Sequence, residues 1–104
     1  MTGALAGVRV LDLSRLLPGP FCSLLLADFG AEVLKVEDTG MGDYIRWSPP
    51  MHEGAEPSAQ SALFLALNRG KRSIRVNLKE DAGREVLLRL ARGYDVLIDG
   101  FRSG

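Results

Sequence analysis

The chain has 104 residues, of which 46% are hydrophobic and 25% are charged, the make-up of one soluble globular domain with a single modest core. Its 13 basic and 13 acidic side chains cancel, which excludes the overall positive field that drives non-specific binding to nucleic acid or an anionic membrane. The lone cysteine, Cys22, excludes an intramolecular disulfide and cannot by itself build a structural zinc site. No targeting segment or membrane span is evident. We therefore expect a cytoplasmic protein with no metal, no nucleic-acid partner and no membrane partner.

The first third of the chain predicts a strand, a helix and a second strand. Strand-forming residues at 7–13 are followed by Pro18-Gly19-Pro20, and proline is tolerated in the first turn of a helix, where its missing N–H has no partner. A helix is predicted over 20–29, and Gly30 follows where a left-handed C-terminal cap is favoured. Its apolar residues at helical spacing are Phe21, Leu24, Leu25 and Phe29. A strand at 32–37 follows at once, which is typical of a βαβ unit with parallel strands.

The rest of the chain predicts a long loop and then a second strand–helix–strand series. Glycines and prolines recur over 38–60, which favours an irregular excursion, and loops of this length are uncommon unless functional. Residues 61–67 predict one or two helical turns. Period-two alternation then predicts a strand at 73–78, followed by an amphipathic helix at 80–92 and a strand at 95–98. These elements define an α/β fold with a parallel sheet and flanking helices. Because no helix covers the last strand, we read residues 1–104 as the incomplete N-terminal part of a larger domain.

Several residues invite a functional hypothesis that the residues alone leave open. Glu37 lies near the position of the ribose-binding acid of dinucleotide-binding folds, but the G-x-G-x-x-G pattern is missing and a solvent-facing acid is favoured. Cys22 is read as a buried structural cysteine rather than a nucleophile. A basic cluster suits either the phosphates of a ligand or a solvated turn, and comprises Arg69, Lys71, Arg72, Arg75 and Lys79. No paired carboxylates or His–Asp spacing supports catalysis, so no catalytic residue is assigned to Asp12, Asp28, Asp43 or Asp99.

Several ordered motifs together resemble the opening of the class III CoA-transferases, a family that includes formyl-CoA transferases, carnitine CoA-transferases and α-methylacyl-CoA racemases. The motifs are GVRVLDLS at 7–14, PGPFC at 18–22, LADFGAEV at 26–33, GKRS at 70–73, NLK at 77–79 and DVL at 95–97 before Phe101. The resemblance covers essentially the whole chain. It implies a Rossmann-like sheet within a longer polypeptide and an interlocked homodimer whose ligand is CoA or acyl-CoA.

Carried over residue by residue, the resemblance implies a CoA site. Leu17 and Pro18, in the first strand-to-helix loop, would line this site, and a later strand would contact the adenosine end through Val76, Asn77, Leu78 and Lys79. Gly100, Phe101 and Arg102 would border the nucleotide and pantetheine. One departure concerns Asp38, because the family usually has an arginine there. An anion at this position should weaken binding of a polyanionic ligand unless Arg72 or Arg102 substitutes for the missing cation.

Two functional hypotheses follow. The first is the CoA-binding part of an enzyme that transfers CoA between carboxylic acids or epimerises a 2-methylacyl-CoA, with the family's catalytic residues falling beyond Gly104. The residues at 19–22 and Gly100 before Phe101 lean slightly toward the racemase branch. The alternative is a stand-alone nucleotide-binding or interaction module without catalysis.

Overall fold

The computed structural model describes residues 3–52, 60–101 and no others. Four parallel strands form the central sheet: β1 (Arg9–Asp12), β2 (Glu32–Glu37), β5 (Arg72–Arg75) and β6 (Val96–Ile98). Their order is β5-β2-β1-β6, so the chain moves outward from β1 on one side and then returns to its other side. This order confirms the predicted α/β class with a parallel sheet.

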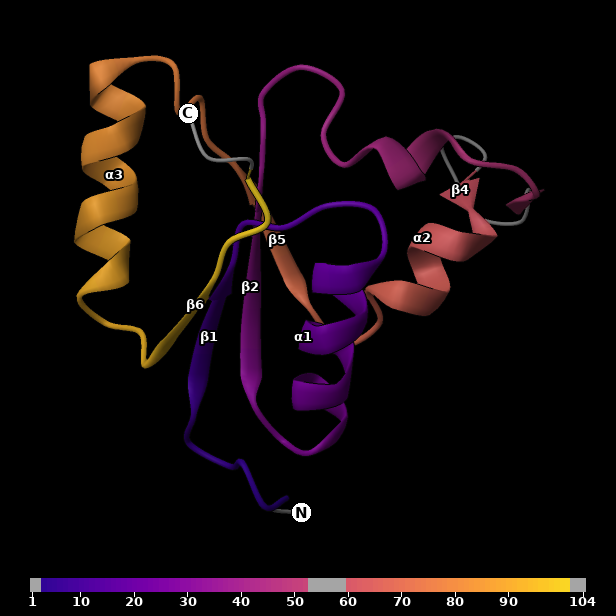
Figure 1. Cartoon of the computed structure of the whole chain (residues 1–104), viewed down its shortest axis with the longest axis horizontal. Helices are drawn as coiled ribbons and strands as arrows, with labels where there is room; N and C mark the ends of the chain where they lie inside the picture. The colour runs from indigo at the N-terminus through magenta and orange to yellow at the C-terminus, as the bar shows by residue number, and fades with distance from the viewer. Residues whose placement is uncertain (1–2, 53–59, 102–104) are drawn as a thin grey trace.

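Helices cover both faces of this sheet (Figure 1). Helix α1 (Pro18–Asp28) lies on one face, where Leu26 and Ala27 pack on a cluster containing Val10 and Val33. Helix α3 (Asp81–Ala91) lies on the other face, where Leu87, Leu90 and Ala91 pack on Leu11, Leu34 and Val36. A central strand covered on both faces is apolar in consecutive residues, which explains why β2 does not alternate.

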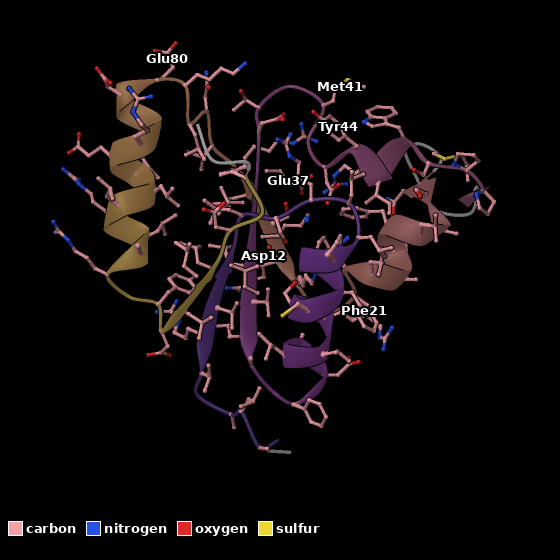
Figure 2. The ribbon with its side chains drawn as sticks, in the orientation of Figure 1. Asp12, Phe21, Glu37, Met41, Tyr44 and Glu80 are labelled. Carbon is pink, nitrogen blue, oxygen red and sulfur yellow. The ribbon has the colours of Figure 1, made fainter. Side chains whose placement is uncertain are left out.

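The helix α1 begins two residues earlier than predicted and buries a different face. Pro18 and Pro20 both lie in its first turn, and Gly30 follows it with a φ of 107°, as expected for a left-handed cap. Its buried residues are Pro20, Ser23 and Leu24, whereas Phe21, Leu25 and Phe29 are exposed. Figure 2 shows Phe21 on the side of α1 away from the sheet. The spacing of the four apolar residues thus predicted the helix correctly, although Leu24 is the one of them that is buried. Cys22 is also exposed, so its prediction as a buried cysteine was wrong.

The excursion predicted at 38–60 holds short regular elements in its described part. A 3-10 turn, η1 (Tyr44–Trp47), is followed by a small antiparallel pair, β3 (Met51–His52) with β4 (Gln60–Ser61). Helix α2 (Ala62–Leu67) then confirms the predicted helical turns. Strand β5 ends at Arg75, earlier than predicted, although Val76 N–H still donates to Glu37 O at 2.9 Å. The described residues contain no helix long and apolar enough to cross a membrane.

Candidate functional site

A cleft lies at the carboxyl ends of the four parallel strands, at the top of the sheet in Figure 1. It consists of a pocket of about 340 Å³ and an adjoining one of about 510 Å³ that share Leu13, Ser14, Arg15, Tyr44 and Phe101. The strand order reverses at β1, with β2 on one side and β6 on the other. In open α/β sheets ligands bind outside the carboxyl ends of the strands at this reversal. The topology therefore makes the cleft the candidate binding site.

The cleft brings together most of the residues predicted from the sequence. The first pocket is lined by Asp38, Val76, Asn77, Leu78, Lys79 and Phe101, and the second by Gly100. Leu17 caps the N-terminus of α1 and Pro18 begins it, but neither lines these two pockets. Arg72 is exposed at the start of β5 and also lies outside both pockets. Arg102 falls outside the described residues.

The predicted basic cluster is divided among several places in the structure. Arg69 pairs with Asp28 at 2.9 Å, and Arg75 donates to the carbonyl oxygen of Gly40 at 2.9 Å. Lys71 turns inward, where its ammonium donates to Pro20 O at 3.0 Å and its side chain is 1% exposed. Of the five basic residues, Lys79 lines the first pocket.

An arginine that the sequence reasoning did not select lies in the cleft. Arg15 lies three residues after the end of β1 and lines both pockets. Its guanidinium lies 4.9 Å from the centre of the Tyr44 ring and 5.9 Å from that of Phe101. Arg15 Nη1 is 3.7 Å from Asp38 Oδ2. Its position shortly after the strand predicted at 7–13 was the available signal, because residues that follow parallel strands meet at one edge of the sheet.

Under the cleft lies a buried ion-pair network of Asp12, Lys35, Glu37, Asp43, Arg46 and Lys71. Asp43 Oδ2 is 2.7 Å from Lys35 Nζ in a fully buried ion pair, and Asp43 Oδ1 accepts from Leu16 N–H at 2.9 Å. Lys35 Nζ also donates to Ser14 O at 3.0 Å. Asp43 therefore connects the loop after β2 to the loop between β1 and α1, and Leu16 is held there with a φ of 65°.

Glu37 belongs to this network, which corrects its prediction as a solvent-facing acid: its side chain is 1% exposed. Arg46 donates to it in a bidentate pair, Nε to Oε1 and Nη2 to Oε2, each at 2.7 Å, and Ser73 Oγ donates to Oε2. Burial alone would raise the pKa of Glu37, but these hydrogen bonds and one from Asp43 N–H lower it to about 2. Figure 2 shows Glu37 at the upper end of the sheet, near Tyr44. Such a carboxylate stays ionised and is unsuited to proton transfer.

The remaining acidic and basic groups of the network are also committed to structural contacts. Asp12 is fully buried and accepts hydrogen bonds from Ser14 and Ser23. Burial lowers the pKa of Lys71 to about 8, although the charge of Asp12 opposes the change. Within residues 3–52 and 60–101, no group of three or more His, Cys, Asp or Glu side chains is placed to hold a metal ion. The charged groups of the network are thus paired with partners within the protein.

Known proteins resemble this chain over nearly its whole length. The profile of CoA-transferase family III matches residues 5–104. A succinyl-CoA:mesaconate CoA-transferase of Haloarcula marismortui is 47% identical over 102 residues, which cover 98% of this chain and 26% of that protein. A formyl-CoA:oxalate CoA-transferase of Bradyrhizobium diazoefficiens is 44% identical over 104 residues, covering all of this chain and 24% of that protein.

A solved structure shares the fold over almost the same span. The crystal structure of a CAIB/BAIF family protein from Brucella suis matches with a TM-score of 0.89 and 41% identity over 97% of this chain and 26% of that one. The chain thus spans about a quarter of the length of the relatives it matches. Since the family profile covers nearly the whole chain, the protein belongs to CoA-transferase family III.

Proposed function

We propose that the protein transfers CoA between carboxylic acids and that residues 1–104 form the part of its site that holds the nucleotide end of CoA. The observation that carries this proposal is the cleft at the reversal of the strand order, lined by the residues that follow β1, β2, β5 and β6. The family supplies the chemistry, because the relatives compared above are named for CoA transfer to or from a carboxylic acid.

The turn after β5 has the features of a nucleotide-binding edge. Asn77 Oδ1 accepts from Lys79 N–H at 3.0 Å, which fixes the turn. Gly83 of α3 lies so close that a Cβ there would be 1.9 Å from Asn77 O, so the helix supports the turn from behind. Lys79 is exposed at the cleft beside the apolar side chains of Val76 and Leu78. An ammonium next to an apolar wall suits a ligand that has both phosphates, which the ammonium would bind, and a flat ring, which would pack on the apolar side chains.

In this proposal the described residues bind CoA, and we assign none of them a catalytic role. Asp12, Glu37 and Asp43 each accept hydrogen bonds from the protein's own side chains or backbone. Transfer is preferred to racemisation because of the relatives' names, despite the lean toward the racemase branch in the sequence at 19–22 and Gly100. A homodimer and a cytoplasmic location stay predictions from the resemblance and the composition.

The test is an acyl-CoA exchange assay on the full-length product of the reading frame. Purified protein is incubated with succinyl-CoA and a series of carboxylic acids, and new CoA thioesters are measured by mass spectrometry. A parallel reaction in deuterium oxide measures α-proton exchange in a 2-methylacyl-CoA. We expect a new thioester together with an equal amount of succinate. Deuterium incorporation without transfer would establish the racemase, and CoA binding without either reaction would establish the binding module. Each of these two results overturns the proposal.

A further inference from the structure

We propose that Arg15 binds a phosphate group of CoA and that Asp38 competes with that phosphate for the guanidinium. This inference rests on the proposed function, since it names the residue that recognises the ligand in the same cleft. It replaces Arg72 and Arg102 as the expected source of the cation. It also gives Asp38 a role different from simple repulsion of the ligand.

The position of Arg15 suits contact with a ligand. It lines both pockets of the cleft, between the end of β1 and the loop after β2. Its side chain is 38% exposed, and the Tyr44 and Phe101 rings lie on its guanidinium at 4.9 and 5.9 Å. Contacts of this kind hold the flat face of an arginine while its N–H edge stays available to a ligand.

Arg15 also has an incomplete set of hydrogen-bond partners among the described residues. Among the described residues its polar contact is Asp38 Oδ2 at 3.7 Å, longer than the 2.7–2.9 Å or so of a charge-assisted hydrogen bond. Arg46, by contrast, makes two hydrogen bonds of 2.7 Å to Glu37. An exposed pair at the longer distance contributes little, and a phosphate carries more charge and more acceptor oxygens than one carboxylate. A phosphate therefore displaces Asp38 from Arg15.

The two carboxylate oxygens of Asp38 have separate roles. Oδ1 accepts from the backbone N–H groups of Gly40 and Gly42 at 2.9 and 3.0 Å and so shapes the start of the long loop. Oδ2 faces Arg15. Asparagine at this position keeps an acceptor for the loop and removes the competing charge. Arginine would lose both loop hydrogen bonds, so Asp38→Asn is the informative substitution.

The experiment is calorimetric titration of the full-length protein with CoA, 3′-dephospho-CoA and pantetheine. Four variants are compared with wild type: Asp38→Asn, Arg15→Gln, the double variant, and the control Glu32→Gln. The control neutralises the carboxylate of another exposed arginine pair, Glu32 with Arg9 at 3.4 Å, at the opposite end of the sheet. Thermal unfolding of each variant verifies that it is folded.

We expect Arg15→Gln to weaken CoA binding about tenfold, the effect of one charge-assisted contact. Asp38→Asn should strengthen it by up to about fivefold, the upper range for an exposed ion pair, and only while Arg15 is present. Glu32→Gln should match wild type, and pantetheine, which lacks the nucleotide phosphates, should bind all variants alike. If 3′-dephospho-CoA binds Arg15→Gln as tightly as wild type, Arg15 contacts the 3′-phosphate. If its affinity falls in Arg15→Gln as that of CoA does, Arg15 contacts the pyrophosphate.

The possible results separate this inference from the proposed function. Wild type that binds CoA with an affinity unchanged in Arg15→Gln overturns the inference and leaves the proposed function standing. The same holds if Asp38→Asn strengthens binding equally with and without Arg15, or if pantetheine loses affinity as CoA does. Wild type that binds no CoA overturns both.

Discussion

Replacing Glu37 with glutamine tests whether the buried ion-pair network stabilises the fold. The carboxylate accepts two hydrogen bonds from Arg46, one from Ser73 and one from Asp43 N–H. Glutamine keeps the shape of the side chain and one acceptor oxygen, but its NH₂ group would face a hydrogen-bond donor that the second carboxylate oxygen now accepts from. Arg46, whose side chain is 30% exposed, then loses its counter-charge.

The magnitude follows from the pKa of Glu37. The difference between the ordinary value of 4.5 and about 2, at about 1.36 kcal/mol per pH unit, corresponds to about 3 kcal/mol of stability. This agrees with the roughly 3–5 kcal/mol for breaking a buried pair. Because the folded-state pKa is lowered, the contribution is complete above pH 4.5 and is lost as the pH falls through about 2.

The assay is urea-induced unfolding followed by circular dichroism at pH 7, 4.5 and 2.5. The matched control is Glu85→Gln, which removes a carboxylate 2.7 Å from Arg89 in a pair that is 62% and 73% exposed. Exposed pairs of this kind contribute about 0.3–0.5 kcal/mol. We expect Glu37→Gln to cost about 3 kcal/mol at neutral pH and progressively less below pH 4.5. Equal costs for the two variants, or a cost for Glu37→Gln that does not change with pH, would refute the reasoning.

Two further predictions concern stability. Gly83→Ala should destabilise the protein by about 1–3 kcal/mol despite alanine's higher helix propensity, because its Cβ would lie 1.9 Å from Asn77 O. Urea-induced unfolding should show a larger loss than for the control Ala82→Gly, a substitution at an exposed position on the same turn that costs about 1 kcal/mol. A gain of stability in Gly83→Ala would contradict the packing argument. The pKa of Lys71 is lowered from 10.5 to about 8, so between pH 8 and 10.5 the unfolded chain binds more protons than the folded one. As the pH rises through this window, the stability of wild type should increase relative to that of Lys71→Met by up to about 3 kcal/mol. A difference that stays flat across this window would show that burial does not disfavour the charge.

The sheet could be predicted because its signals are local. Consecutive apolar residues such as Val33 and Leu34, set between a glycine and a loop, identify a buried strand without any knowledge of its neighbours. The strand–helix–strand spacing then fixes parallel pairing, and the carboxyl edge of the sheet follows from topology. Most of the residues expected at the site reach the cleft for this reason.

The buried charges could not be predicted because their partners lie on other segments, outside the regular pattern of the strand. Lys35 reads as a surface residue until Asp43, on a loop with no regular pattern, is placed beside it. Glu37 depends in the same way on Arg46 and Ser73. The buried face of α1 could not be predicted for another reason: the helix is apolar on all sides, so its periodicity does not reveal that Ser23 rather than Phe21 faces the sheet.

The ion pairs of Asp43 and Arg46 also restrict how this cleft can change in evolution. Loops commonly accept substitution more readily than strands. In this loop, however, Asp43 and Arg46 are bound to β2, so replacement of either leaves a buried charge without its counter-charge unless the partner changes at the same time. The exposed side chains of Met41 and Trp47, in the same segment, carry no such requirement. Divergence among descendants of this protein should therefore accumulate at those two positions, while Asp43 and Arg46 change only by paired substitutions.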